Sequence, residues 1–373
     1  MRKRIAYIVG KDPTDKRAWS GTCYSCLQEL TRFYDVSIIA VKSNIIEIVI
    51  QAIYTLYCLI FSYHPVRSSL NLISKNKCRR INKILKKKEY DGIFLIGIDL
   101  GAYINTKVPI LYFSDATFNL MVDYYWPNCN RSTVKQGNLL QKKCMQNSTY
   151  CMFASGWAIN DAVNYYGIPR DKCILGKLGA NVDTSSFEYK EHSDKIVNLL
   201  FVGVDWKRKG GDIAVECVEY LNKADKEKRY VLHIVGSLPT PPRKLNNEHI
   251  KIYGFLNRNI PEQQELLISL REKADIFILP TQAECAGIVF CESSAYGIPS
   301  ITYDTGGIGD YVINGENGYR LPIGASGKEF ARVIMDLVNS PGKLNEMRKN
   351  AKEMYSKELN WNHLGDIIHS VLR

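Results

Sequence analysis

The sequence lacks an apolar run of transmembrane length, a glycine-rich dinucleotide fingerprint, internal repeats and low-complexity segments. Its longest apolar stretch, residues 45–61, contains Glu47 and Gln51 and is shorter than the roughly 20 residues that a membrane-spanning helix needs. Neither half of the chain has Gly-x-Gly-x-x-Gly after its first expected strand. Because that turn approaches a dinucleotide pyrophosphate, its absence argues against a Rossmann-type dehydrogenase.

Cysteine usage and the N-terminus both predict a cytoplasmic protein. The 11 cysteines are an odd number without framework spacing, which is typical of a reducing compartment. Cys23 and Cys26 have no second Cys-x-x-Cys pair to complete a zinc site, so we interpret them as packing residues of a helix. In residues 1–10 charges precede an apolar run, but no small-residue cleavage site follows, so we expect a buried first strand there.

The net charge of +11 is concentrated in one region. Eight cations fall in an acid-free stretch: Lys75, Lys77, Arg79, Arg80, Lys83, Lys86, Lys87 and Lys88. An interfacial helix over 45–61 followed by this basic helix would suit contact with an anionic membrane surface through residues 45–88. The alternative is a core-facing helix followed by a solvated basic one. No motif that reads nucleic acid accompanies the charge, so nucleic acid is not an expected partner.

Strands and helices alternate in two successive series, which predicts an α/β protein of two domains. A chain of 373 residues is long for one compact core. The expected strands of the first series are 5–9, 36–41, 92–98, 108–113, 151–154 and 173–178, and those of the second are 197–202, 230–235, 250–253, 275–279, 300–303 and 318–321. Each series predicts a doubly wound, Rossmann-like parallel sheet with covered faces. We expect domains at 1–183 and 184–354, a polar linker over 183–194, and a cleft at the carboxyl ends of both sheets.

The most informative stretch, residues 280–299, ends a strand, forms a loop and opens a helix near Ile288. Free backbone N–H groups at that helix start, at Ile288 and Val289, are suited to a diphosphate. Gly287 lets a ligand approach the backbone closely. Glu284 can reach sugar hydroxyls and Glu292 can accept hydrogen bonds from a ribose. The alternatives are a solvated loop acid for Glu284 and an acid stabilised by the helix dipole for Glu292.

These residues resemble the retaining GT-B glycosyltransferases of family 4, the glycosyl transferases group 1. The resemblance rests on two glutamates seven residues apart, followed by Gly-x-Pro, by Thr305-Gly306-Gly307 and by the turn at 314–318. Residues 201–203 and 208–210 resemble the phosphate-binding loop of this family, and residues 179–183 the segment that enters its linker. The likeness is close in the second domain and loose in the first.

The resemblance implies roles for further residues. Arg208 and Lys209 would neutralise the donor diphosphate as it departs; the alternative is a pair of surface charges. Many relatives have an arginine directly after the glycine at Gly203, where this chain has Val204. Arg208 would supply the missing charge, and the resemblance supports its role less strongly than that of Lys209. The other implied donor contacts are Gly203, Gly254, Phe255, Gly306 and Gly307.

In the first domain the resemblance points to Gly21, on the loop that follows the first strand. Its alternative is a helix start capped by Ser20 or Thr22. Many relatives place a histidine after the strand 108–113, but this chain has none there. We therefore expect Asp115 to contact the acceptor or the donor sugar, with a turn-forming acid as the alternative. The C-terminal segment 355–373 resembles the helix that completes the first domain in this family.

The implied function is transfer of a sugar from a nucleotide-sugar donor, a UDP- or GDP-sugar, to a saccharide or lipid-linked acceptor with retention. Surface polysaccharide or glycolipid assembly is the expected setting, and a peripheral position on the inner face of the cell membrane the expected location. No Asp-x-Asp stands at a strand end, which with Arg208 and Lys209 implies metal-independent transfer without a cofactor. The alternative is a non-catalytic GT-B subunit that binds nucleotide-sugar or lipid.

Overall fold

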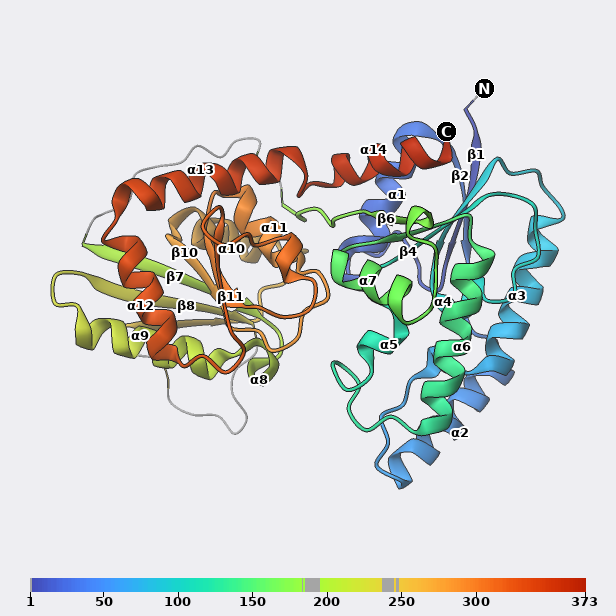
Figure 1. Ribbon diagram of the computed structural model, residues 1–373, viewed down its shortest axis with the longest axis horizontal. Helices are drawn as coiled ribbons and strands as arrows, with labels where there is room; N and C mark the ends of the chain where they lie inside the picture. Colours follow the sequence, from blue (N-terminus) through green and yellow to red (C-terminus); the bar gives the residue numbers. More distant parts are fainter. Residues whose placement is uncertain (1, 183, 185–194, 237–244, 246–247) are drawn as a thin grey trace. The chain divides into compact units, whose positions relative to one another are not determined.

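The computed structural model describes residues 2–182, 184, 195–236, 245 and 248–373 (Figure 1). The chain divides into two units, Met1–Leu178 with Trp361–Arg373, and Gly179–Asn360. Residue 183, where the sequence places the domain boundary, and most of the expected linker lie outside the described residues.

The first unit is built on a parallel sheet of six strands in the order β2-β1-β3-β4-β5-β6. The strands are β1 (Arg4–Val9), β2 (Asp35–Ala40), β3 (Gly92–Ile96), β4 (Ile110–Ser114), β5 (Tyr150–Phe153) and β6 (Cys173–Leu175). The central strands β1, β3 and β4 are buried almost throughout, because helices cover both faces of the sheet.

The helices of the first unit include one that the sequence analysis missed. They are α1 (Thr22–Phe33), α2 (Ile45–Ile60), α3 (Asn71–Leu85), α4 (Ile98–Gly101), α5 (Phe118–Met121), α6 (Arg131–Asn147), α7 (Gly156–Asn164) and α14 (Trp361–Leu372). The missed helix, α6, is polar and contains Gly137, which weakens its helical pattern. A Cβ at Gly137 would lie 2.0 Å from the ring of Phe118, so close packing against that ring requires the glycine.

The second unit has its own parallel sheet, in the order β12-β11-β10-β7-β8-β9. Its strands are β7 (Ile196–Gly203), β8 (Arg229–Gly236), β9 (Ile250–Gly254), β10 (Ile276–Leu279), β11 (Ser300–Tyr303) and β12 (Gly318–Leu321). Its helices are α8 (Trp206–Lys209), α9 (Gly211–Ala224), α10 (Pro261–Lys273), α11 (Ile288–Ala295), α12 (Gly327–Val338) and α13 (Pro341–Lys357). The strand order reverses between β7 and β10, the position at which such sheets bind ligands.

The predicted fold class, two doubly wound parallel α/β sheets, is confirmed, and the expected C-terminal segment 355–373 contains the end of α13 and the whole of α14, which belongs to the first unit. The chain there forms α13 and α14 with a break between them (Figure 1). The side-chain amide of Asn360 donates to the carbonyl oxygens of Tyr355 and Ser356, which ends α13, and Leu359 is fully buried. Helix α14 then packs on α1, where His369 stacks on Phe33 at 4.2 Å between ring centroids.

Candidate functional site

The two strands at the topological switch of the second unit present the predicted cations and one predicted glutamate. Strand β7 ends at Gly203 and leads into α8, which carries Arg208 and Lys209; β10 leads into the loop of Glu284. The two segments are joined by a hydrogen bond of 2.8 Å from the Gln282 N–H to the Arg208 carbonyl oxygen. The sheet topology therefore brings together residues that are about 75 positions apart in the sequence.

Lys209 and Glu284 form an ion pair at this position. The ammonium of Lys209 donates to a carboxylate oxygen of Glu284, and the side chains are only 9% and 13% exposed. A Cβ at Gly203 would lie 2.9 Å from Cγ of Lys209, so the glycine makes room for the lysine stem. Neither charge is the solvated surface group that the alternatives describe. Because little water screens the two charges, the attraction between them is stronger than it would be in bulk solvent.

Arg208 is held on the rim of the same position. Its guanidinium donates to the carboxylate of Asp205 at 3.2 Å and to the carbonyl oxygen of Ala283 at 3.0 Å. The side chain of Asp205 also accepts from the Arg208 N–H and so caps the short helix α8. Val204, which occupies the place of the arginine in many relatives, is 63% exposed. Arg208 is thus directed to the loop of Glu284 by two fixed contacts.

Helix α11 begins directly after the loop of Glu284, as expected. Gly287 precedes it with φ of +84°, a left-handed conformation that a side chain would strain. A Cβ there would also lie 2.5 Å from the ring of Phe290. The half-buried Ile288 and Val289 form the first turn, where backbone N–H groups have no partner within the helix. The start of α11 therefore offers donors and a positive dipole end beside Glu284.

Glu292 lies inside α11 in a cluster with two arginines that the sequence analysis missed. It is 1% exposed and pairs with the buried Arg271 of α10 and with Arg258, which follows β9. Burial lowers the pKa of Arg271 from its ordinary value, and the charge of Glu292 opposes this shift. One carboxylate oxygen, Oε1, lies 2.8 Å from Nη2 of Arg258 in the ion pair, but it has no hydrogen bond of good geometry to any described residue. The sequence signal that could have revealed this cluster is Arg271 itself, since it shares the buried face of α10 with Leu267 and Leu270, and a buried arginine needs an acidic partner.

The glycines expected at the donor site divide into two groups. Gly306 and Gly307 follow β11, and the N–H of Gly307 donates to the carbonyl oxygen of Glu284 at 3.1 Å, which ties them to the switch position. Gly254 ends β9, at the edge of the sheet and two strands from β7, and Phe255 follows it. Phe255 is 69% exposed, and a Cβ on Gly254 would meet nothing within 4 Å.

In the first unit the structure brings the loop of Gly21 against Asp115. Trp19 and Ser20, just before Gly21, both adopt the left-handed conformation, with φ of 50° and 54°. Such backbone costs about 1–3 kcal/mol per non-glycine residue and concentrates at functional sites. The indole N–H of Trp19 donates to Oδ2 of Asp115 at 3.2 Å. Gly21 itself is the N-cap residue of α1, so neither Ser20 nor Thr22 occupies that position.

We expect Trp19→Phe to lower the turnover number about tenfold, because a hydrogen bond to a charged group contributes about 1.5 kcal/mol. The phenyl ring preserves the packing on Phe113, so loss of the hydrogen bond to Asp115 is the main change. Steady-state kinetics check this, with Trp157→Phe as the control for an indole elsewhere in the unit. A Trp19→Phe enzyme as active as the control would contradict a role for Asp115.

Among the described residues, no group of three or more His, Cys, Asp or Glu side chains is arranged to hold a metal ion. A hollow of about 490 Å³ opens beside the Trp19 loop in the first unit and is lined by charged side chains of residues 11–17 and by Lys42. In the second unit the charged groups at the switch position are the cations and glutamates already described.

Comparison with known proteins finds a family model that matches the second unit. Residues 182–354 match the family model for glycosyl transferases group 1. The chain is 30% identical over 106 residues to the D-inositol 3-phosphate glycosyltransferase of Rhodococcus jostii, which is 28% of this chain and 23% of that protein. It is 26% identical over 204 residues to the capsular polysaccharide biosynthesis glycosyltransferase CapM of Staphylococcus aureus, covering 52% and 51%. The chain spans less than half the length of the first curated relatives it matches.

Solved structures match the whole chain. The Anabaena protein HepE in complex with UDP superposes with a TM-score of 0.65 at 15% identity, over 100% of this chain and 99% of that one. At this identity the likeness concerns the fold alone. The chain has the GT-B fold, and its residues 182–354 carry the sequence pattern of the glycosyl transferases group 1.

Proposed function

We propose that the protein transfers a sugar from a nucleotide-sugar donor to a saccharide or lipid-linked acceptor. One observation carries the proposal: Lys209 and Glu284 form an enclosed ion pair where α11 begins, at the switch of the second sheet. A diphosphate at this position would accept hydrogen bonds from the N–H groups of Ile288 and Val289. The match of residues 182–354 to glycosyl transferases group 1 supports the same function.

The neighbouring groups then have distinct tasks. The ammonium of Lys209, and the guanidinium of Arg208 after a change of rotamer, neutralise the diphosphate as negative charge develops on it. Glu284, released from Lys209 by the competing phosphate, accepts hydrogen bonds from sugar hydroxyls. Oε1 of Glu292 accepts from a ribose hydroxyl, since it is a buried acceptor without a hydrogen bond of its own.

We further propose retention of the anomeric configuration without a metal ion. In the step, the bond from the anomeric carbon to the phosphate oxygen breaks and the bond to the acceptor oxygen forms on the same face. The departing phosphate oxygen takes the acceptor proton, so no protein nucleophile is required. The cations Arg208 and Lys209 would supply the charge stabilisation that a divalent metal provides elsewhere.

The donor is proposed to be a UDP- or GDP-sugar, and the setting to be surface polysaccharide or glycolipid assembly at the inner face of the cell membrane. The names of the relatives support this setting, since one acts in capsular polysaccharide biosynthesis, and the Anabaena structure contains UDP. No helix among the described residues is long and apolar enough to cross a membrane.

A thermal-shift screen against UDP-, GDP-, ADP- and dTDP-sugars tests the donor. We expect one of them to stabilise the native state by about 2.7 kcal/mol at 100 times its Kd, because ligand binds only the folded protein. Absence of a shift with all four, together with absence of heat in calorimetry, would overturn the proposal. Binding without sugar transfer or slow donor hydrolysis would instead favour a non-catalytic GT-B subunit.

A further inference from the structure

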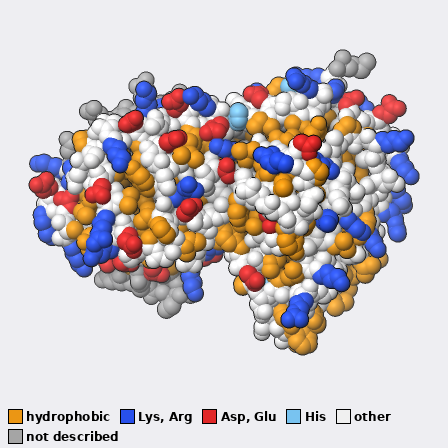
Figure 2. All heavy atoms as spheres, in the orientation of Figure 1, with side chains coloured by type: hydrophobic (Ala, Val, Ile, Leu, Met, Phe, Trp, Pro, Cys, Tyr) orange, Lys and Arg blue, Asp and Glu red, His pale blue; other side chains and the backbone are white. Residues whose placement is uncertain are grey.

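The surface of the first unit carries a large apolar helix face that no described part of the protein covers. Nine of the 16 residues of α2 are exposed large hydrophobics, among them Ile45 at 80%, Ile53 at 64% and Leu59 at 66%. Only a narrow stripe that includes Glu47 and Cys58 is buried against the protein. Figure 2 shows these hydrophobic side chains gathered over α2 at the lower edge of this unit. Soluble monomers rarely expose so much contiguous apolar surface.

The charges around this helix are almost all positive. Glu47 is the only acid between residues 42 and 88, and it is buried in contact with Arg80. Lys77 pairs with Asp99, and the other six cations of residues 75–88 are exposed, as are Lys42 and Arg67. Helix α6, which packs against α3, contains no acid at all.

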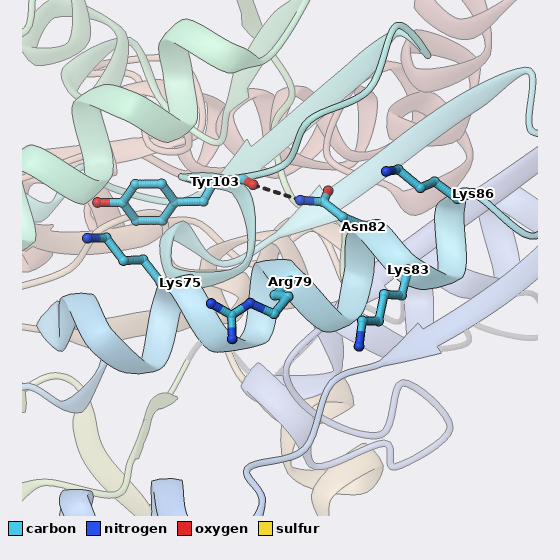
Figure 3. Close-up of a pocket in the computed structure, with 6 residues that line it drawn as sticks. All are labelled: Lys75, Arg79, Asn82, Lys83, Lys86 and Tyr103. Atoms are coloured by element: carbon cyan, nitrogen blue, oxygen red, sulfur yellow. Dashed lines mark hydrogen bonds between the residues drawn. The ribbon is translucent and has the colours of Figure 1, made fainter.

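Some of these cations line one hollow on α3. It measures about 480 Å³ and is lined by Lys75, Arg79, Asn82, Lys83, Lys86 and Tyr103 (Figure 3). The side-chain amide of Asn82 donates to the Tyr103 carbonyl oxygen at 3.1 Å, which holds these two lining residues together. Arg79, Lys83 and Lys86 form no ion pair with any residue that the structure describes. The hollow therefore presents unneutralised cations to a ligand that carries phosphate.

We propose that α2 and α3 dock the protein on a bilayer that contains anionic lipid. Helix α2 lies in the plane of the interface with its apolar face among the acyl chains, and the α3 cations bind headgroup phosphates. The aromatic cluster of Tyr57, Phe61 and Tyr63 at the end of α2 fits the depth where aromatic rings concentrate. A second copy of this chain fits less well, because a two-fold contact would place the same cations against one another.

Sedimentation of the full chain with vesicles tests this surface. The probe is an equal mixture of phosphatidylcholine and phosphatidylglycerol, compared with phosphatidylcholine alone. We expect binding to the anionic vesicles that weakens as salt is raised. The triple change Arg79→Gln, Lys83→Gln and Lys86→Gln should weaken it about 100-fold, at about fivefold per cation.

The apolar arm of the test is Ile53→Gln with Leu56→Gln, which should weaken binding at least about tenfold. Matched controls are Ile323→Gln for an exposed apolar residue and the triple change Lys223→Gln, Lys251→Gln and Lys349→Gln for exposed cations, and melting temperatures monitor folding. The proposal would be overturned if the wild type did not bind anionic vesicles, or if the α3 triple variant and the α2 double variant bound them as well as the controls do. It would also be overturned if the wild type were a dimer that Ile53→Gln with Leu56→Gln dissociates. The proposed sugar transfer is tested separately by donor binding and survives such a result.

Discussion

Replacing Lys209 by methionine is expected to lower the rate of sugar transfer by about 10²–10³, the usual loss when a donor to a developing charge is removed. Methionine fills the space beside Gly203 but supplies no charge to the departing diphosphate. The same change leaves Glu284 without its ion-pair partner at a position only 13% exposed. Turnover numbers measured with the donor identified in the thermal-shift screen check the prediction.

The control for this change lies on the same short helix. Lys207 is exposed and adjacent in α8, so Lys207→Met removes a neighbouring positive charge without entering the ion pair. We expect it to keep wild-type turnover. Melting temperatures of both variants show whether a loss of activity comes from the missing charge or from destabilisation of the fold. A Lys209→Met enzyme with the activity of Lys207→Met would remove the ion pair from the proposed mechanism.

Arg271→Leu is expected to lower the free energy of unfolding by about 3–5 kcal/mol, because it leaves the carboxylate of Glu292 buried without its buried cation. Arg258 remains as a partner, but its side chain is 42% exposed and its attraction is screened by solvent. The melting temperature should fall by about 10 °C, given roughly 2–4 °C per kcal/mol for a unit of this size. Thermal and urea unfolding of the ligand-free protein measure the change.

Two further variants test the physical cause. Lys273→Leu removes an exposed cation from the same helix α10 and should change stability by less than about 0.5 kcal/mol. Arg271→Leu combined with Glu292→Leu removes both buried charges and should recover part of the loss, since replacing a buried pair by apolar residues is often neutral. Equal losses in the single and double variants would show that packing, not the unpaired charge, dominates.

Most helices and strands were predictable because their signals are local. The strands at 300–303 and 318–321 begin and end where the sequence predicts, since turn residues bound these short segments. Helix α6 was missed because its polar composition and Gly137 give a weak pattern, and its stability comes from packing against the sheet. The break between α13 and α14 was missed because it depends on the side-chain amide of Asn360 bonding back to α13.

The sequence by itself determined the two α/β units, the glutamate pair at Glu284 and Glu292 and the basic stretch at 75–88. Periodicity, spacing and charge depend only on the order of residues along the chain. Tertiary structure alone decided the partners: Lys209 for Glu284, Arg271 and Arg258 for Glu292, and Trp19 for Asp115. It also decided that the apolar face of α2 points outward. Strand order sets these contacts, since hydrogen bonds between strands distant in the sequence bring their carboxyl ends to one edge.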